Sequence, residues 1–334
     1  IDEAGQAMEP EAVAPVACLL SGQGQLVLAG DPQQLGPVIH SAVAKENGLA
    51  DSFLERLMRR RIYSRGRNGR FDERVLTQLT HNFRSHEALL ELPNRLFYDN
   101  ALECKASAML KNHCVGWDQL PNRKIPMIFH GIVGKDMRER GSPSWFNPDE
   151  CAVCVDYVKQ LLDIRGKTVL PSEIGVIAPY HKQVMKLTRA FKGQDFDVSA
   201  NGIKVGSTEH FQGQERKIII ISTVRSSEEH VGTDVRHNIG FLDNPKRFNV
   251  SITRACSLLI VIGNPNVLWQ DEHWQALIRR CLDLKAYTGM EFTPPADGEN
   301  NNGNDELTDD LEELNQGEAS AAVLQEGMAM PTYE

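Results

Sequence analysis

The sequence lacks any apolar run of the roughly 20 residues that a helix needs to cross a bilayer. It also lacks a signal peptide and an initiating methionine, because the chain starts at Ile1, which reads as the last residue of a strand. The first two absences argue against a membrane-spanning or secreted protein, and we expect no membrane partner. The third predicts that the chain is a fragment of a longer protein.

Basic residues are absent from the C-terminal stretch. Residues 297–334 contain eleven acids and no lysine or arginine. Those eleven charges exceed the formal net charge of −9, so the rest of the chain carries +2, which is compatible with a groove for nucleic acid. With so few large apolar groups, residues 295–334 are predicted to form a disordered acidic tail. Leu307, Leu311 and Leu314 recur there at helical spacing, which leaves open a short helix that binds a partner.

Cysteines do not form an obvious framework. The seven cysteines are scattered, which is typical of reduced thiols in the cytosol. Cys151 and Cys154 form a C-x-x-C pair, and zinc would need further ligands such as His113 and Cys114. However, the stretch 147–150 (Asn-Pro-Asp-Glu) has the N-cap, proline and acid of a helix start. We therefore interpret both cysteines as helix residues.

Two adjacent carboxylates, Asp2 and Glu3, follow an apolar residue at the start of the chain. P-loop NTPases end the second strand of their nucleotide site in this way: the first acid holds Mg²⁺, and the second can polarise the water that attacks the γ-phosphate. An isolated acidic pair is more often solvated surface. The pair gains meaning only from the motifs that follow it.

An apolar run at Leu26–Gly30 is typical of a buried parallel strand. It is followed by Gln33 and Gln34, and ligands bind at the carboxyl ends of strands in open α/β sheets. A glutamine there can hydrogen-bond both a γ-phosphate oxygen and a water. The alternative is a Pro/Gly turn with polar side chains.

Helical and strand patterns alternate along the rest of the chain, which predicts an α/β fold with a parallel sheet. The expected helices cover 11–20, 42–60, 87–98, 148–163, a segment from 181, 245–254 and 269–284. The expected strands cover 126–131, 173–180, 203–207, 217–224 and 258–263. Ser85 is predicted to cap the helix 87–98, which leaves Arg84 where a cation could reach a phosphate; the alternative is a surface ion pair.

Five stretches stand in the order of motifs II to VI of superfamily 1 helicases. They are Asp2-Glu3-Ala4-Gly5, Gly30–Pro37, Asn82–Ser85, Phe211–Glu215 and Asn249–Ala255. The first two resemble the up-frameshift branch, which acts on RNA. The text at 141–148, 213–216, 222–227 and 240–250 resembles the Moloney-leukaemia-virus-ten and Armitage type of RNA helicase.

The resemblance covers residues 1 to about 290 and implies tandem RecA-like P-loop NTPase domains with parallel sheets flanked by helices. Residues 1–75 would be the C-terminal part of a truncated first domain, with 61–75 as the passage between domains. Residues 76–294 would be the second domain, and the acidic tail would follow.

The resemblance also assigns roles to individual residues. Asp2 is similar to the Mg²⁺ ligand and Glu3 to the water-activating base. The catalytic set further includes Gln34 as the γ-phosphate sensor, and Arg84 and Arg254 as arginines that reach the γ-phosphate from the second domain. Glu215 matches the acid that holds the ribose of ATP, with Gly213 beside it in the same motif. Tyr180, His181 and Ser207 match positions along the RNA track.

No G-x-x-x-x-G-K-[ST] stretch occurs in the chain, although backbone amides and a lysine are needed to cradle the phosphates of ATP. We therefore expect that loop to lie upstream of Ile1 and the chain alone to hydrolyse little or no ATP. In the longer protein, acids from one domain and arginines from the other would complete the site only when the domains close. Closure and reopening would then move RNA that is held across both domains.

These observations predict the C-terminal part of an ATP-dependent RNA helicase that acts on single-stranded RNA and RNA duplexes. The resemblance implies 5′-to-3′ movement, a role in RNA silencing or mRNA regulation, and silencing-complex or messenger ribonucleoprotein partners. It also implies a cytoplasmic location, including ribonucleoprotein granules. Three alternatives stay open: a nucleotide-switched RNA clamp without processive unwinding, a DNA helicase, and an interaction module that acts through its tail.

Overall fold

The computed structural model describes residues 1–19, 22, 24–67, 69, 71–139, 141–142, 144–164, 168–227, 241–242 and 244–295. The predicted acidic tail lies outside the described residues except for Pro295, so its predicted disorder and short helix stay predictions. Parts of the stretches 141–148 and 240–250 also lie outside them.

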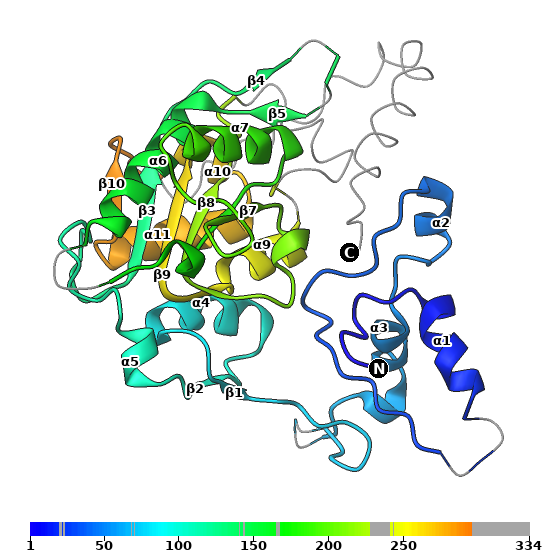
Figure 1. Cartoon of the computed structure of the whole chain (residues 1–334). Coiled ribbons are helices and arrows are strands. Elements are labelled where there is room, and N and C mark those ends of the chain that lie inside the picture. Colours follow the sequence, from blue (N-terminus) through cyan, green and yellow to red (C-terminus); the bar gives the residue numbers. More distant parts are fainter. Residues whose placement is uncertain are drawn as a thin grey trace.

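A six-stranded parallel sheet forms the centre of the larger part of the molecule, in the order β10-β3-β9-β8-β6-β7 (Figure 1). Its strands are β3 (Met127–Gly131), β6 (Ile174–Ile177), β7 (Lys204–Gly206), β8 (Arg216–Ser222), β9 (Ala255–Gly263) and β10 (Tyr287–Gly289). The predicted parallel α/β fold is confirmed. The edge strand β10 was not predicted, since three residues are too few to show a pattern.

Helices cover both faces of this sheet (Figure 1). They are α4 (Glu87–Phe97), α5 (Ala108–Lys111), α6 (Pro148–Leu162), α7 (His181–Lys192), α9 (Pro245–Ile252), α10 (Pro265–Leu268) and α11 (Glu272–Asp283). In β8, Ile218 and Ile220 pack in the cluster with α6 and α7, whereas Ile219 and Ile221 pack in the cluster with α4, α9 and α11. Both faces are buried, which is why the strands are continuous apolar runs.

Helix starts follow their capping residues. Asn147 caps α6 by accepting from the backbone N–H groups of Asp149 and Glu150, as predicted. The predicted cap of α4 is wrong: His86 Nδ1 accepts from the Ala88 N–H, whereas the buried Ser85 hydroxyl donates to the Ala255 carbonyl at 2.9 Å. The Ser85 hydroxyl therefore binds a distant carbonyl and does not cap the helix.

Several short elements complete this part of the chain. The pairs β1 (His81–Asn82) with β2 (Glu103–Cys104) and β4 (Met137–Arg138) with β5 (Trp145–Phe146) are parallel and antiparallel, respectively. Two 3₁₀ turns, η2 (Pro171–Glu173) and η3 (Glu209–Phe211), precede β6 and follow β7. We call residues 76–295 the sheet region.

Residues 1–60, the N-terminal region, lie beside the sheet region (Figure 1). This region contains α1 (Glu9–Ala17), α2 (Ala42–Glu46) and α3 (Phe53–Met58), and a 3₁₀ turn, η1 (Arg61–Tyr63), follows it. The helix predicted at 11–20 is confirmed as α1. The predicted helix over 42–60 is wrong as one element, because Gly48 adopts φ +86° between α2 and α3. The last predicted helix, 269–284, is confirmed as α11, and the short α10 that precedes it was not predicted.

The buried strand predicted at Leu26–Gly30 is also wrong. The segment is extended and hydrogen-bonds Ile1 and Ala4 through Val27 and Ala29, each at 2.8 Å, but it is not a strand and Val27 is 72% exposed. Among the described residues, the run pairs with the segment at residues 1–4. Two paired segments do not bury each other's faces, so most apolar side chains of the run stay exposed to solvent.

Candidate active site

The N-terminal and sheet regions meet through polar contacts. Gln34 Oε1 accepts from Arg254 Nη2 at 3.2 Å, and the Leu35 carbonyl accepts from Gln212 Nε2 at 3.2 Å. Farther along the same boundary, Lys246 pairs with Glu55 at 3.0 Å. The structure thus brings together predicted catalytic residues that lie 220 positions apart.

Arg254 stands at the junction between α9 and β9 and is 1% exposed. Its Nε donates to the Val250 carbonyl at 3.0 Å, and Nη1 donates to the Gln214 carbonyl at 3.4 Å. No carboxylate among the described residues lies in ion-pair contact with it. Burial, and then the neighbouring Arg84, lower the pKa of Arg254 to about 10, which leaves the guanidinium charged at neutral pH.

The orientation of the Gln34 amide is fixed by its two partners. Its Nε2 donates to Asp31 Oδ2 at 2.9 Å, and its oxygen faces the guanidinium of Arg254. A carboxylate only accepts and a guanidinium only donates, so the amide fits in one orientation alone. The carbonyl end of Gln34 therefore points toward the sheet region.

Arg84 comes from the loop between β1 and α4. Its Nε contacts the carboxylate of Glu215, and its Nη1 donates to the Thr253 carbonyl at 3.2 Å. Glu215 remains half exposed. The arginine and the acid predicted for the γ-phosphate and the ribose are thus neighbours, and Arg84 is also the largest electrostatic influence on Arg254.

The acidic pair lies opposite this set. Glu3 adopts φ +49°, and a Cβ placed on Gly213 would lie 3.4 Å from Glu3 Oε1. Gly213 itself has φ +65°, a conformation that favours glycine. Asp2 is exposed, and its Oδ1 accepts from the Glu3 N–H at 2.9 Å. The predicted base and the predicted cofactor-binding glycine therefore face each other across the boundary.

Sequence reasoning missed three residues at this boundary. The Tyr98 hydroxyl donates to Asp31 Oδ2 at 2.8 Å and accepts from Asn249 Nδ2 at 2.9 Å. The same Nδ2 donates to the Gln33 carbonyl at 2.9 Å. Asp31 and Asn249 lie inside recognised motifs, but nothing in the sequence around Tyr98 indicates a polar role.

The three residues predicted for the RNA track differ in accessibility. His181 is exposed at the first position of α7, and Ser207 follows β7 with its hydroxyl 3.1 Å from His210 Nδ1. Tyr180 is 1% exposed, and its hydroxyl accepts from Arg225 Nε at 3.0 Å. The Tyr180 ring thus packs inside the sheet region, and an RNA role for all three residues stays a prediction.

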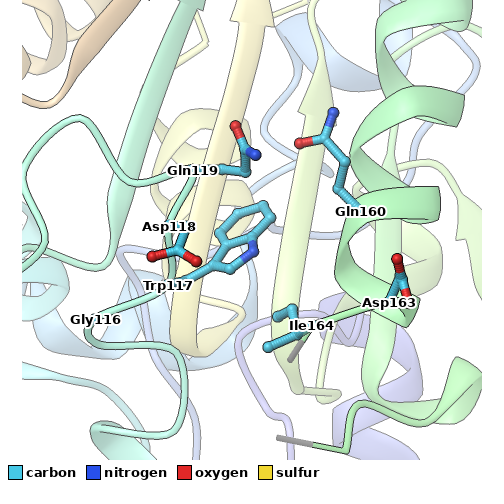
Figure 2. A pocket seen from close by; sticks show the side chains of 7 residues that line it. All are labelled: Gly116, Trp117, Asp118, Gln119, Gln160, Asp163 and Ile164. Carbon is cyan, nitrogen blue, oxygen red and sulfur yellow. The ribbon is translucent and has the colours of Figure 1, made fainter. Parts of the chain in front are cut away.

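Other features lie away from this boundary. A polar pocket is formed by the loop 116–119 on one side and by Gln160, Asp163 and Ile164 on the other (Figure 2). None of the predicted site residues lines it. Cys151 and Cys154 are buried on α6, and within the described ranges three or more potential ligands gather nowhere in a metal-binding arrangement. No described helix is long and apolar enough to span a membrane.

Comparison with known proteins identifies the family. Sequence profiles described as AAA domains match residues 49–266 and residues 1–42. The Danio rerio protein mov-10-B.1 is 51% identical over 302 residues, covering 88% of this chain and 30% of its own length. The human RNA helicase Mov10l1 is 48% identical over 299 residues, covering 88% of this chain and 24% of its own length.

The Drosophila melanogaster protein armi is 38% identical over 308 residues, with 87% and 25% coverage. The chain thus spans less than a third of the length of each of these relatives. The five motifs, the parallel sheet and these similarities agree. This chain therefore belongs to the superfamily 1 helicases of the up-frameshift-like branch, in the group of MOV-10, Mov10l1 and armi.

Proposed function

We propose that this chain supplies the water-activating acid and both γ-phosphate arginines of an ATP-hydrolysing RNA helicase. Glu3 polarises the attacking water, Gln34 senses the γ-phosphate, and Arg84 and Arg254 stabilise the charge that develops on it. Glu215 holds the ribose. The chain contains no G-x-x-x-x-G-K-[ST] loop, so we expect these 334 residues by themselves to hydrolyse little ATP.

One observation carries this proposal: Arg254 is buried, charged and without a carboxylate in ion-pair contact among the described residues, and it faces Gln34 of the other region. A buried charge without a counter-ion is costly unless a ligand compensates it. The γ-phosphate is an anion of suitable geometry, since a guanidinium can donate to two of its oxygens.

The residues present fit Mg²⁺, which prefers oxygen ligands and binds through one or two carboxylates together with substrate phosphates. Asp2 offers an exposed carboxylate beside Glu3. Asp2 would hold Mg²⁺, which supplies charge neutralisation of the ATP phosphates. Asp2 also accepts from the Glu3 backbone, and this contact helps to orient the adjacent base.

The RNA part of the proposal rests on the relatives and on the sheet region. Mov10l1 is named an RNA helicase, and exposed His181 stands at the start of α7, where RNA would pass Ser207. The 5′-to-3′ direction, the role in silencing or mRNA regulation, the ribonucleoprotein partners and the cytoplasmic location stay predictions from the resemblance.

The test is Glu3→Gln in an ATPase-competent form of the protein that includes a phosphate-binding loop upstream of Ile1. We expect kcat to fall by about 10²–10⁴, because a positioned base contributes that much. ATP and RNA binding should persist, since the substitution keeps the size of the side chain. Glu46→Gln, an exposed acid on α2, is the matched control and should retain full activity.

Near-normal hydrolysis by the Glu3→Gln protein would remove Glu3 from the catalytic set. A single-turnover measurement of ATP hydrolysis on the unsubstituted protein distinguishes the helicase from the alternative, a nucleotide-switched clamp. ATP that binds, closes the two regions and leaves unhydrolysed supports the clamp, whereas hydrolysis coupled to duplex separation supports the helicase.

A further inference from the structure

A sharp corner ends helix α4 on the side of the N-terminal region. Asp99 and Asn100 follow Tyr98 with φ +51° and +58°, a conformation that Asp and Asn tolerate better than other residues with a Cβ. The Asn94 side chain fastens the corner, because it donates to the Leu102 carbonyl and accepts from the Leu102 N–H, both at 2.9 Å. Tyr98 is therefore held at a fixed place at the edge of the sheet region.

From this corner, side chains reach two separate parts of the chain. The Tyr98 hydroxyl reaches Asp31 of the N-terminal region at 2.8 Å, and Asp99 pairs with Arg65 of the connecting segment at 2.8 Å. The Arg65–Asp99 pair is largely exposed and contributes little. Tyr98 is mostly buried, and its contact involves a carboxylate, so it is the stronger tie.

Asp31 links this tie to the catalytic glutamine. Its Oδ2 accepts from both the Tyr98 hydroxyl and Gln34 Nε2, while its Oδ1 accepts from the Gln33 N–H at 2.9 Å. The carboxylate is thus held by three donors, one of which comes from the other region. The position of Asp31 determines which end of the Gln34 amide faces Arg254. Loss of the Tyr98 donor therefore makes the orientation of that amide less well fixed.

A buried tyrosine often does no more than satisfy its own hydroxyl inside a core. Tyr157 on α6 is an example, because it contacts His130 Nδ1 at 2.9 Å within the sheet region. Tyr98 differs, since its acceptor lies in the other region and is itself bonded to a catalytic side chain. Asn249, which donates to both Tyr98 and the Gln33 carbonyl, closes a second path between the two regions.

We propose that Tyr98 is a positioning residue: together with Asp31 and Asn249 it forms a corner latch that holds the two regions closed and sets the Gln34 amide toward Arg254. The catalytic part of this inference rests on the proposed ATP hydrolysis. The inference about closure does not rest on ATP hydrolysis, because the latch contacts join protein groups alone.

Closure is tested first on this chain itself. Spin labels are placed on Cys18, which is exposed at the end of α1, and on a cysteine introduced at exposed Met185 of α7, with Cys104 replaced by serine. Tyr98→Phe keeps the ring and removes only the hydroxyl. We expect a longer and broader label separation than in the parent chain, whereas Tyr157→Phe, which also loses one buried hydroxyl contact, should leave the separation unchanged.

Catalysis is tested in the ATPase-competent form. Tyr98→Phe should lower kcat roughly tenfold with KM within a few fold, since a hydrogen bond to a charged group is lost and binding of ATP is not. Asp31→Asn should lower kcat at least as much. Its amide NH2 replaces one carboxylate oxygen and cannot accept a hydrogen bond from the donor that faces it. The double variant should be no slower than Asp31→Asn alone, because both changes act through one contact.

An unchanged label separation in the Tyr98→Phe chain overturns the latch, as do fully additive losses in the double variant. These outcomes are distinct from failure of the proposed function. If Glu3→Gln hydrolyses ATP normally, the catalytic assignment fails, while the label measurement still decides whether Tyr98 holds the regions together. Equal melting temperatures of the two Phe variants exclude general unfolding as the cause.

Discussion

The two regions of this chain are built in different ways. Every member of both large apolar clusters lies at position 89 or later, in the sheet region. Among the described residues before position 80, the buried apolar side chains are Ala4, Ala12 and Ile39. The sheet region is a scaffold with its own core, whereas the N-terminal region carries the proposed catalytic side chains Glu3 and Gln34 on segments with few buried apolar residues.

The N-terminal region is held instead by polar contacts. Glu9 of α1 pairs with Arg56 of α3 at 2.6 Å, and Ile1 and Ala4 pair with the extended segment that precedes Asp31. Its ties to the sheet region are side-chain hydrogen bonds. Segments with few apolar contacts open locally at low free energy, and the proposed ATP hydrolysis needs such a boundary, which can close and open again.

The largest expected effect is on kcat and comes from Arg254, a residue of the sheet region that contacts Gln34 of the N-terminal region. Arg254→Lys in the ATPase-competent form should lower kcat by roughly 10³-fold, because lysine keeps the charge but loses the fork that meets two phosphate oxygens. KM should change much less, since the contact strengthens mainly in the transition state. Steady-state ATPase kinetics measure both quantities.

The matched control for this prediction is Arg247→Lys on α9, where the arginine pairs with Glu209 of the sheet region at 2.8 Å. It should keep its kcat. If Arg254→Lys loses melting temperature and nucleotide-free RNA affinity in step with kcat, Arg254 supports the fold rather than the γ-phosphate, and full kcat in that variant removes the arginine from catalysis.

A second prediction separates the regions by their cores. Ile260→Ala on central strand β9 should destabilise the sheet region by about 2–5 kcal/mol, because the side chain is fully buried and leaves a cavity. Val27→Ala should change stability by no more than about 0.5 kcal/mol, since that side chain is 72% exposed. Urea unfolding of both variants measures the two losses; similar losses would contradict a core that lies in the sheet region.

The same contrast explains what the sequence could predict. Isoleucine runs such as 218–221 are buried on both faces, so composition alone indicates a parallel sheet. The run at Leu26–Gly30 is also apolar, but Leu26 and Val27 are exposed, because burial depends on neighbouring strands and not on the run itself. A local apolar pattern predicts a strand well only where neighbouring strands and helices bury it.

For the site, motifs predicted which residues matter but not how they are held. The contact between Gln34 and Arg254 joins two recognised motifs. Tyr98 enters through a corner built by Asn94, Asp99 and Asn100, and such a long-range geometry leaves no trace in residue spacing. Tyr180 shows the reverse: its position matched the RNA track, but packing against Arg225 buries its ring.

A third prediction uses Glu150, a fully buried acid of the sheet region. Burial raises the pKa of Glu150 to about 8, although Ser222 and Val224 donate hydrogen bonds that oppose the shift. Because this folded-state pKa exceeds the ordinary value of 4.5, the folded chain holds the proton more tightly than the unfolded chain. The resulting stability is complete below about pH 4.5 and is lost as the pH rises through 8.

Glutamine does not titrate, so the stability of the parent chain relative to Glu150→Gln should fall by at least about 1 kcal/mol between pH 5 and pH 8. Denaturant unfolding at a series of pH values measures this difference. The exposed Glu46→Gln of the N-terminal region is the control and should show a flat difference. A flat profile for Glu150→Gln would mean that the hydrogen bonds from Ser222, Val224 and Asn147 keep the folded carboxylate charged from pH 5 to pH 8.

The smallest effect repeats the contrast between core and surface inside the sheet region, at two adjacent residues. His181 is exposed, so His181→Ala should weaken binding of single-stranded RNA roughly two- to fivefold without changing the melting temperature. Tyr180→Phe keeps the buried ring and loses the bond from Arg225, so it should lower stability by about 1 kcal/mol and leave RNA affinity unchanged. Fluorescence anisotropy with a labelled RNA and a thermal melt on the same preparations measure both quantities. If Tyr180→Phe weakens RNA binding and His181→Ala does not, then RNA is recognised by a form of the sheet region in which the Tyr180 ring has left its place against Arg225.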